Sequence, residues 1–451
     1  MMALPRLKPN TDLDSAVADA EARYIASNPK SRARAEVAKA SMPGGNTRTV
    51  LHYAPFPVAF TGGEGCRVTD IDGHTYTDFL GEYTAGLYGH SNPRIMATLR
   101  TVIDGGVTLG GPNVYEAELA HLLCERFASI ELVRFCNSGT EANLFAMVTA
   151  RMVTKRSHIM VMNGGYHGGV FYFGQHKPPI NAPFPWVIAR YNDIERTLSQ
   201  IEAHAHELAA VVIEPMMGGG GAIAADAAFL QALRDACTRH GIVLIFDEVM
   251  SSRLSSGGLQ KKHGITPDMT TLGKYLGGGM SFGAFGGRHD IMQHYDPHRA
   301  GSTPHAGTFN NNVLSMAAGI VGLRDIYTAE VADTFNASAD TFRDRLNAIM
   351  TRHGVAMQTM GVGSILALHF AVGEIKRPED TWAMDATAER RKADLYKLLH
   401  LDMMEMGQYF ARRGMLSLSL PMGLAEFAAF ESALDEFLTV RGPVLREALQ
   451  A

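Results

Sequence analysis

The stretch Ile242-Val243-Leu244-Ile245-Phe246-Asp247 is a short apolar run, rich in β-branched side chains, that ends in an acidic residue. Three further apolar runs occur in the chain, at residues 132–136, 158–162 and 209–213. Continuous runs of this length are typical of parallel strands buried on both faces. The stretches between them, such as 141–147 and 229–234, carry good helix formers at helical spacing. The sequence therefore predicts an α/β domain with a mainly parallel sheet flanked by helices.

The N-terminal part of the chain differs in character from this middle part. It contains Gly62-Gly63-Glu64-Gly65 and Asp70-Ile71-Asp72-Gly73, which are typical of turns in a small sheet. We expect this segment, residues 1–85, to contribute to a second, smaller domain.

The C-terminal part also differs from the middle. A long helix-like run from Thr328 to Gly354 precedes apolar segments at 365–368 and 416–420, which predicts an α+β domain. The predicted division is residues 1–85 as an N-terminal segment of the small domain, 86–325 as the large domain, and 326–451 as the C-terminal small domain.

Composition and charge argue against several classes of protein. The 451 residues hold 41 Lys and Arg against 46 Asp and Glu, and no basic block resembles a phosphate-backbone footprint, so we expect no nucleic acid partner. No run approaches the roughly 20 apolar residues that span a bilayer, so we expect no membrane partner. The first residues lack the apolar core of a signal peptide, and the 4 cysteines form no CxxC pair. These features predict a cytoplasmic protein with reduced thiols and no metal site.

Residues 135–143 lead from a predicted strand through a glycine turn into a helix. Backbone N–H groups at such a helix start, with the hydroxyls of Ser138 and Thr140 around Gly139, would hold a phosphate group. A second interpretation needs no ligand, because Ser138 and Glu141 also have the spacing of an ordinary capping box. This motif alone leaves both interpretations open.

Asp247 follows directly after five apolar residues. A buried carboxylate is costly unless a cation or a hydrogen-bond donor meets it. Asp247 could therefore cap a helix, bind a metal, or hold a proton on the nitrogen of a heteroaromatic ring.

Two further motifs follow predicted strands. Lys274 lies in Thr270-Thr271-Leu272-Gly273-Lys274-Tyr275-Leu276-Gly277-Gly278-Gly279. Most lysines are surface charges, but these apolar and glycine neighbours favour a desolvated amine whose lowered pKa suits Schiff-base formation.

The other motif is Gly164-Gly165-Tyr166-His167-Gly168-Gly169. Its aromatic pair could stack on a planar cofactor or fill an edge of the core.

One cofactor would use all four motifs together. Pyridoxal phosphate requires a phosphate cup, an acid at the ring nitrogen, a Schiff-base lysine and a stacking aromatic side chain. The separate structural interpretations do not predict that set in that order. The sequence therefore predicts pyridoxal 5′-phosphate as the cofactor.

These motifs resemble those of the class III (fold type I) pyridoxal-phosphate aminotransferases, whose near relatives include glutamate-1-semialdehyde aminomutase. The resemblance extends from about Gly44 to Pro421. Four motifs resemble the bacterial β-phenylalanine aminotransferases in particular: Asn46-Thr47-Arg48, Glu82-Tyr83-Thr84-Ala85-Gly86, Gly307-Thr308-Phe309-Asn310-Asn311-Asn312 and Arg413-Gly414. The resemblance implies a fold type I transferase that moves the amino group of a β-amino acid, such as (S)-β-phenylalanine, to 2-oxoglutarate or pyruvate by a ping-pong mechanism.

The resemblance also implies catalytic and cofactor-binding roles. Lys274 matches the Schiff-base lysine, which also moves the proton between the substrate carbon and the cofactor. Asp247 matches the acid that keeps the pyridine nitrogen protonated. The matched phosphate cup consists of Ser138, Gly139 and Thr140.

Four other positions are expected at the cofactor. Tyr166 matches the stacking ring, and His167 follows it. Glu214 ends another predicted strand and is expected to border the site. Thr308 matches a residue that reaches the phosphate of the neighbouring subunit's cofactor. That match implies a homodimer with active sites at the subunit interface.

Two arginines match positions that bind substrate carboxylates in the β-phenylalanine aminotransferases. Arginine is suited to this role because its planar fork binds a carboxylate bidentately. By the resemblance, Arg48 holds the carboxylate of the β-amino acid and Arg413 holds a carboxylate of the keto acid, with Arg412 as an adjacent competitor. Tyr83 and Tyr88 are expected to line the pocket for the aromatic side chain.

Other functions remain open at this stage. A glutamate-1-semialdehyde 2,1-aminomutase, which moves the amine within one molecule, would use the same motifs around Lys274, although the two arginine positions favour transamination. A racemase or decarboxylase on the same fold has no distinguishing feature in this sequence. A non-enzymatic binding protein is disfavoured because all cofactor positions are intact.

Overall fold

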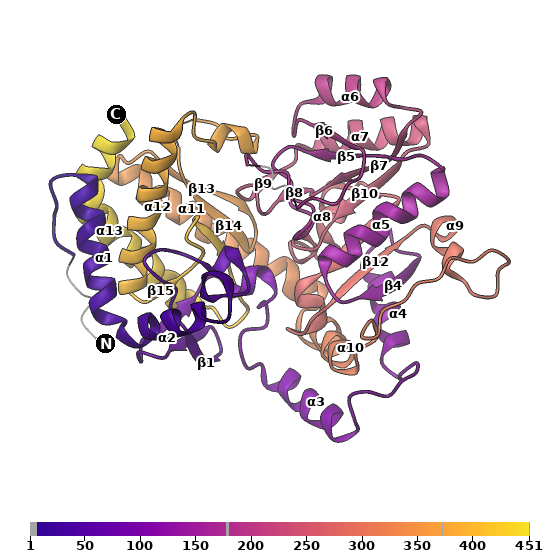
Figure 1. Cartoon of the computed structure of the whole chain (residues 1–451), viewed down its shortest axis with the longest axis horizontal. Coiled ribbons are helices and arrows are strands. Elements are labelled where there is room, and N and C mark those ends of the chain that lie inside the picture. Colours follow the sequence, from indigo (N-terminus) through magenta and orange to yellow (C-terminus); the bar gives the residue numbers. More distant parts are fainter. Residues whose placement is uncertain (1–6, 177–179, 372, 451) are drawn as a thin grey trace.

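The computed structural model describes residues 7–176, 180–371 and 373–450. The chain forms two lobes (Figure 1). One lobe contains the middle of the chain, and the other contains both chain ends. No helix within the described ranges is long and apolar enough to cross a membrane.

A seven-stranded sheet, in the order β4-β12-β11-β10-β7-β5-β6, forms the centre of the large lobe. Its strands are β4 (Leu132–Cys136), β5 (His158–Met162), β6 (Trp186–Ala189), β7 (Leu208–Ile213), β10 (Val243–Asp247), β11 (Met269–Gly273) and β12 (Gly283–Gly287). Strand β12 runs antiparallel to both of its neighbours, and the other strands are parallel to one another. The prediction of a mainly parallel sheet is therefore confirmed.

Helices cover both faces of this sheet. The helices that pack on its strands are α4 (Glu116–Arg126), α5 (Gly139–Thr154), α6 (Ile194–Ala203), α7 (Ala227–His240) and α9 (His289–Met292). The same lobe contains α8 (Gly258–His263) and the pair α3 (Pro93–Asp104) and α10 (Val313–Ile320), which pack against each other. Along β10, Leu244 and Phe246 belong to the core beneath α7, whereas Val243 and Ile245 belong to the core beneath α5. Apolar residues at consecutive positions of β10 are thus explained by burial on both faces.

The C-terminal part of the small lobe is an α+β layer. Its elements are α11 (Ala329–His353), β13 (Met357–Val362), β14 (Ile365–Phe370), α12 (Ala386–Glu405), β15 (Gln408–Tyr409), β16 (Met415–Ser417) and α13 (Leu424–Gln450). Helix α11 starts after its N-cap Thr328 and ends at Gly354, which adopts φ 61°. Strand β16 is shorter than the apolar run at 416–420, and beyond it the carbonyl of Leu418 accepts a hydrogen bond from the Arg253 side chain.

The N-terminal segment joins the same lobe. It forms α1 (Leu13–Ser27), α2 (Pro29–Lys39), β1 (Phe60–Glu64), β2 (Arg67–Asp70) and β3 (Thr75–Asp78). Strand β3 pairs in parallel with β15, so the two ends of the chain share one four-stranded sheet. The boundaries at residues 85 and 325 stay predictions.

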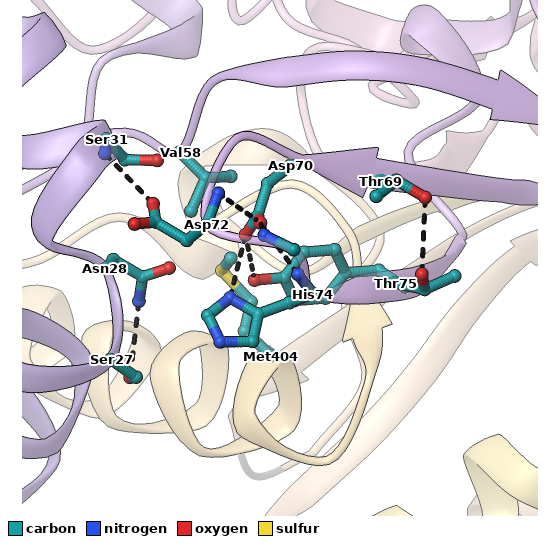
Figure 2. Close-up of polar contacts among 12 residues, drawn as sticks. Ser27, Asn28, Ser31, Val58, Thr69, Asp70, Asp72, His74, Thr75 and Met404 are labelled. Carbon is teal, nitrogen blue, oxygen red and sulfur yellow. Dashed lines mark hydrogen bonds and ion pairs between the residues drawn. The ribbon is translucent and has the colours of Figure 1, made fainter.

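Helix α2 is capped by a residue from outside the helix. Its N-cap Asn28 makes no side-chain capping bond. Instead, the carboxylate of Asp72 accepts hydrogen bonds from the backbone N–H groups of Lys30 (2.7 Å) and Ser31 (2.9 Å), and Figure 2 shows the contact with Ser31. Burial acts to raise the pKa of Asp72, but the hydrogen bonds at Ser31 and Lys30 outweigh it and lower the pKa. This contact holds the start of α2 against the β2–β3 turn. The loop that carries Arg48 follows α2 in the chain.

Candidate active site

Five strands of the large sheet end at one edge, and a predicted site residue follows each of them. Ser138 follows β4, Tyr166 follows β5, Glu214 follows β7, Asp247 ends β10 and Lys274 follows β11. All five side chains line one cavity of about 490 Å³. The carboxyl edge of a parallel sheet is where α/β proteins bind their ligands, so the topology brings together residues that are far apart in sequence.

Asp247 lies at the centre of a buried hydrogen-bond network. Its Oδ2 accepts from Nδ2 of Asn143 (2.8 Å) and contacts Nδ1 of His167 (2.8 Å), while its Oδ1 accepts from the backbone N–H of Val249 (3.0 Å). Burial acts to lower the pKa of His167, but the hydrogen bond and charge of Asp247 outweigh it, so the pKa is raised. Asn143, Val249 and His167 together give the buried carboxyl group of Asp247 the polar partners that such a group needs.

Asn143 orients this network, although the sequence did not identify it as a site residue. Besides its bond to Asp247, its Nδ2 donates to the carbonyl of His167 (3.0 Å), and its Oδ1 accepts from Oγ1 of Thr271 (2.9 Å). Asn143 lies on α5, one turn after the predicted phosphate cup. The other buried positions of α5 are alanine, methionine and Thr149, so the sequence pattern alone does not single out Asn143.

Lys274 projects from a strained position. Its backbone φ is 60°, in the left-handed region that residues other than glycine seldom adopt. Burial lowers the pKa of its amine, with a further lowering by the guanidinium of Arg48. An amine with a lowered pKa is neutral in a larger fraction of molecules at a given pH, which is the form that attacks a carbonyl.

The predicted phosphate cup lies at the start of α5. Gly139 and Thr140 occupy the first turn, where backbone N–H groups have no carbonyl partner within the helix. Oγ of Ser138 accepts from the N–H of Glu141 (3.2 Å), which leaves its hydroxyl proton available. The capping interpretation is therefore half correct, because the Glu141 carboxylate bonds the N–H of Asn137 rather than that of Ser138. Capping and anion binding are compatible here.

A glycine forms the opposite wall of the cup. Gly168 has φ 134°, and a Cβ at this position would lie 2.4 Å from Oγ1 of Thr140. The N–H of Gly169 donates to the same Oγ1 (3.2 Å), so the hydroxyl proton of Thr140 is free to donate elsewhere. Close approach of this loop to Thr140 therefore requires glycine at position 168.

Glu214 holds the loop that carries Tyr166. Its Oε1 accepts from the N–H of Tyr166 (2.8 Å) and its Oε2 from the N–H of Gly218 (3.0 Å). Burial raises the pKa of Glu214 to about 7, although the charge of His167 and the two N–H groups act to lower it. Glu214 thus borders the cavity and fixes the backbone beneath the Tyr166 ring.

Both predicted substrate arginines contact Tyr83. The guanidinium of Arg48 lies 5.7 Å from the centroid of the Tyr83 ring, and that of Arg413 lies 5.6 Å from it. Arg48 lines the cavity with Lys274. Tyr83, Arg412 and Arg413 line a neighbouring cavity of about 500 Å³. The Tyr83 ring therefore contacts one arginine from each cavity.

Two predicted residues line neither of these cavities. Tyr88 is buried in an apolar cluster with Tyr275, and its hydroxyl occupies the space where a Cβ on Gly322 would lie. The expectation that Tyr88 lines the substrate pocket is therefore not met. Thr308 lies in an exposed turn. Asn310 in the same segment accepts a hydrogen bond from Asn137 (3.0 Å), the residue before Ser138.

The donors in the Lys274 cavity match pyridoxal 5′-phosphate group by group. The helix start and two free hydroxyls suit a phosphate, the carboxyl group of Asp247 suits a protonated ring nitrogen, and the amine of Lys274 suits an aldehyde. The fold and this site define a fold type I pyridoxal-phosphate enzyme.

Comparison with known proteins assigns the family. Residues 50–390 match the model of the class III aminotransferases, and the chain belongs to this family. The protein is a pyridoxal-phosphate-dependent aminotransferase.

Two proteins that are similar in sequence to this chain are named as different enzymes, a transaminase and an aminomutase. The chain is 46% identical over 436 residues to the beta-phenylalanine transaminase of Variovorax paradoxus, covering 97% of this chain and 99% of that protein. It is 36% identical over 395 residues to a glutamate-1-semialdehyde 2,1-aminomutase of Prosthecochloris aestuarii, covering 83% of this chain and 90% of that protein. A solved structure of the beta-phenylalanine aminotransferase from Variovorax paradoxus superimposes with a TM-score of 0.93 at 46% identity, covering 96% of this chain and 99% of that chain.

Proposed function

We propose that this enzyme transfers the amino group of a β-amino acid, such as (S)-β-phenylalanine, to an α-keto acid, 2-oxoglutarate or pyruvate, in a ping-pong reaction. The observation that carries the proposal is the pair of guanidinium groups over one tyrosine ring, beside the buried amine of Lys274. The 46% identity to a beta-phenylalanine transaminase supports it.

The residues divide the work around the cofactor. Ser138, Gly139 and Thr140 hold its phosphate, Asp247 keeps a proton on its ring nitrogen, and the ring of Tyr166 covers its face. Pyridoxal phosphate, when bound, supplies an electron sink for the charge that develops on the substrate carbon. Lys274 removes the proton from that carbon and returns it, because its amine is desolvated and has a lowered pKa.

Three residues support these groups without moving protons. His167 and Asn143 fix the orientation of the Asp247 carboxylate. Glu214 holds the backbone of Tyr166. Their hydrogen bonds limit how far Asp247 and the stacking ring can shift between the two half-reactions.

We propose that the two arginines bind different carboxylates. Arg48 lines the Lys274 cavity and binds the carboxylate of the β-amino acid. Arg413 lines the neighbouring cavity and binds a carboxylate of the keto acid. Tyr83 contacts both guanidinium groups and forms part of the wall for the substrate side chain.

The proposal includes a homodimer in which Thr308 reaches the phosphate cup of the partner subunit. Large apolar side chains are exposed around this turn: Ile103, Val107, Leu109, Val114 and Phe309. The two segments that carry them are joined by hydrogen bonds from Asn113 to the carbonyl of Asn311 (2.7 Å) and from Asn311 to that of Gly111 (3.1 Å). Apolar exposure of this kind supports an interface between subunits.

A spectroscopic titration tests the proposed reaction. 3-Amino-3-phenylpropanoate is added to the cofactor-loaded enzyme without keto acid, and 2-oxoglutarate is added afterwards. We expect the visible absorption band to disappear with the amino acid and to return with the keto acid. A band that does not respond to the β-amino acid would contradict the substrate assignment, and glutamate-1-semialdehyde would then be tested.

A further inference from the structure

We propose that Glu82 is a specificity-determining residue whose carboxylate occupies Arg48 in the unliganded enzyme and must be displaced by the carboxylate of the substrate. The inference rests on the proposed function, since it takes Arg48 as the binding group for that carboxylate. By this inference, the Glu82 carboxylate is an internal anion that competes with the substrate carboxylate for Arg48. Its consequence is that Glu82 sets the affinity of the enzyme for carboxylate ligands.

The geometry places this anion inside the site. Nη1 of Arg48 forms an ion pair with Oε1 of Glu82, and both residues line the cavity that contains Lys274. Arg413 contacts the same Tyr83 ring but forms no side-chain ion pair within the described part of the chain. The two arginines are therefore inequivalent, because only Arg48 carries an internal carboxylate.

The backbone under Glu82 is held in a costly conformation. Glu82, Tyr83 and Thr84 have φ values of 47°, 51° and 80°, and three successive left-handed residues of this kind persist only where their surroundings impose them. The surroundings do so here, since the side chain of Arg253 donates to the carbonyl of Thr84 (3.2 Å) and the hydroxyl of Tyr83 donates to the carbonyl of Val50 (3.0 Å). The base of the Glu82 side chain is thus fixed beside Arg48.

The carboxylate itself is free to leave. The side chains of Glu82 and Arg48 are 57% and 41% exposed, and ion pairs with this much exposure contribute little net stability. After displacement, Glu82 would face water, so no unpaired charge would be buried. A guanidinium presents one planar fork to a bidentate carboxylate, so Glu82 and the substrate compete for the same donors.

Equilibrium binding of an unreactive acid tests the inference. The probe is 3-phenylpropanoate, which has a carboxylate and no amine, and its Kd for the cofactor-loaded enzyme is measured by calorimetry. We expect Glu82→Gln to lower this Kd about two- to fivefold at low salt, an effect that shrinks at high salt. Glu82→Asn is a second neutral variant, because asparagine adopts left-handed φ more readily than most residues.

Two controls separate competition from other effects. The neutral analogue 3-phenylpropanamide should bind the wild type and Glu82→Gln alike. Glu202→Gln removes a glutamate of similar exposure, 55%, that pairs with Arg239 away from the cavity, and should leave the Kd of 3-phenylpropanoate unchanged.

The outcomes distinguish this inference from the proposed function. Arg48→Gln should weaken binding of 3-phenylpropanoate in the presence and absence of Glu82. If Arg48→Gln weakens binding but both Glu82 variants bind no more tightly than the wild type, Glu82 merely positions Arg48, and the inference is overturned while the proposed function stands. If Arg48→Gln leaves the Kd unchanged, Arg48 is not the carboxylate site, and both are overturned.

Discussion

Nδ1 of His167 lies 2.8 Å from Oδ2 of Asp247, and both side chains are buried beneath the cavity that contains Lys274. The pair matters because an isolated buried carboxylate would favour its protonated form. His167 gives this carboxyl group a hydrogen-bond partner, and the contact raises the pKa of His167. The burial of Asp247 is therefore compensated where the proposed reaction needs an acid.

The first prediction concerns the charge of Asp247. Asp247→Asn keeps the shape of the side chain but removes the anion, so a proton on the ring nitrogen is no longer stabilised. We expect kcat for amino transfer to fall by on the order of 10³-fold, as when a preorganised electrostatic group is lost. Steady-state kinetics with saturating cofactor measures the effect. A near-normal kcat would show that another group protonates the ring nitrogen.

The second prediction concerns the amine of Lys274. Lys274→Ala removes the group that forms the covalent link and moves the proton, so turnover should be abolished. The phosphate cup and Asp247 are untouched, and the folded variant should still retain cofactor noncovalently. Cofactor released on denaturation, measured per subunit, checks retention. Appreciable turnover by the purified variant would refute the assigned role.

The third prediction uses two adjacent glycines as a matched pair. Gly168→Ala introduces a Cβ 2.4 Å from Oγ1 of Thr140 at a φ of 134°, whereas a Cβ on Gly169 meets no atom within 4 Å. Strain of this kind costs on the order of 1–3 kcal/mol, so we expect Gly168→Ala to raise the Kd of pyridoxal phosphate about tenfold or more. Gly169→Ala should bind as the wild type does. Equal Kd values for the two variants would contradict the proposed cup.

Much of the site was predictable because its chemistry follows strand ends. Asp247 and Lys274 each come directly after a buried strand, and parallel strands bring such positions to one edge of the sheet. The glycine and hydroxyl residues at 138–140 could be identified for the same reason. The pattern of apolar strands and the residues that follow them was therefore sufficient to predict these positions.

Other features depend on the tertiary structure. Asn143 reaches Asp247 from the second turn of a helix, and its pattern alone does not distinguish it from a solvated residue. Glu82 faces Arg48 because three non-glycine residues adopt positive φ, which local propensity disfavours. Tyr88 was expected in a pocket but is buried, because the small residue Gly322, far away in sequence, leaves room for its hydroxyl.

The fourth prediction concerns the cap of α2. Asp72→Ala leaves the N–H groups of Lys30 and Ser31 without their acceptor, and loss of such a cap costs about 1 kcal/mol. We expect Tm to fall by roughly 2 °C. Asp72→Asn keeps one acceptor oxygen and should fall between the wild type and the alanine variant. An unchanged Tm for Asp72→Ala, measured by calorimetry at neutral pH, would show that the cap contributes nothing.

The last prediction is a pH dependence set by Glu214. Burial raises its pKa to about 7, whereas an exposed glutamate has a pKa of about 4.3. A carboxyl group whose pKa is raised by folding stabilises the folded state fully at low pH, and this contribution is lost as the pH rises through 7. The loss amounts to about 4 kcal/mol at most, and Glu214→Gln, which is neutral throughout, does not undergo it. The Tm of the variant minus that of the wild type should therefore increase by a few degrees between pH 5 and pH 8. A Tm difference for Glu214→Gln that stays constant across this range would mean that Glu214 is ionised throughout.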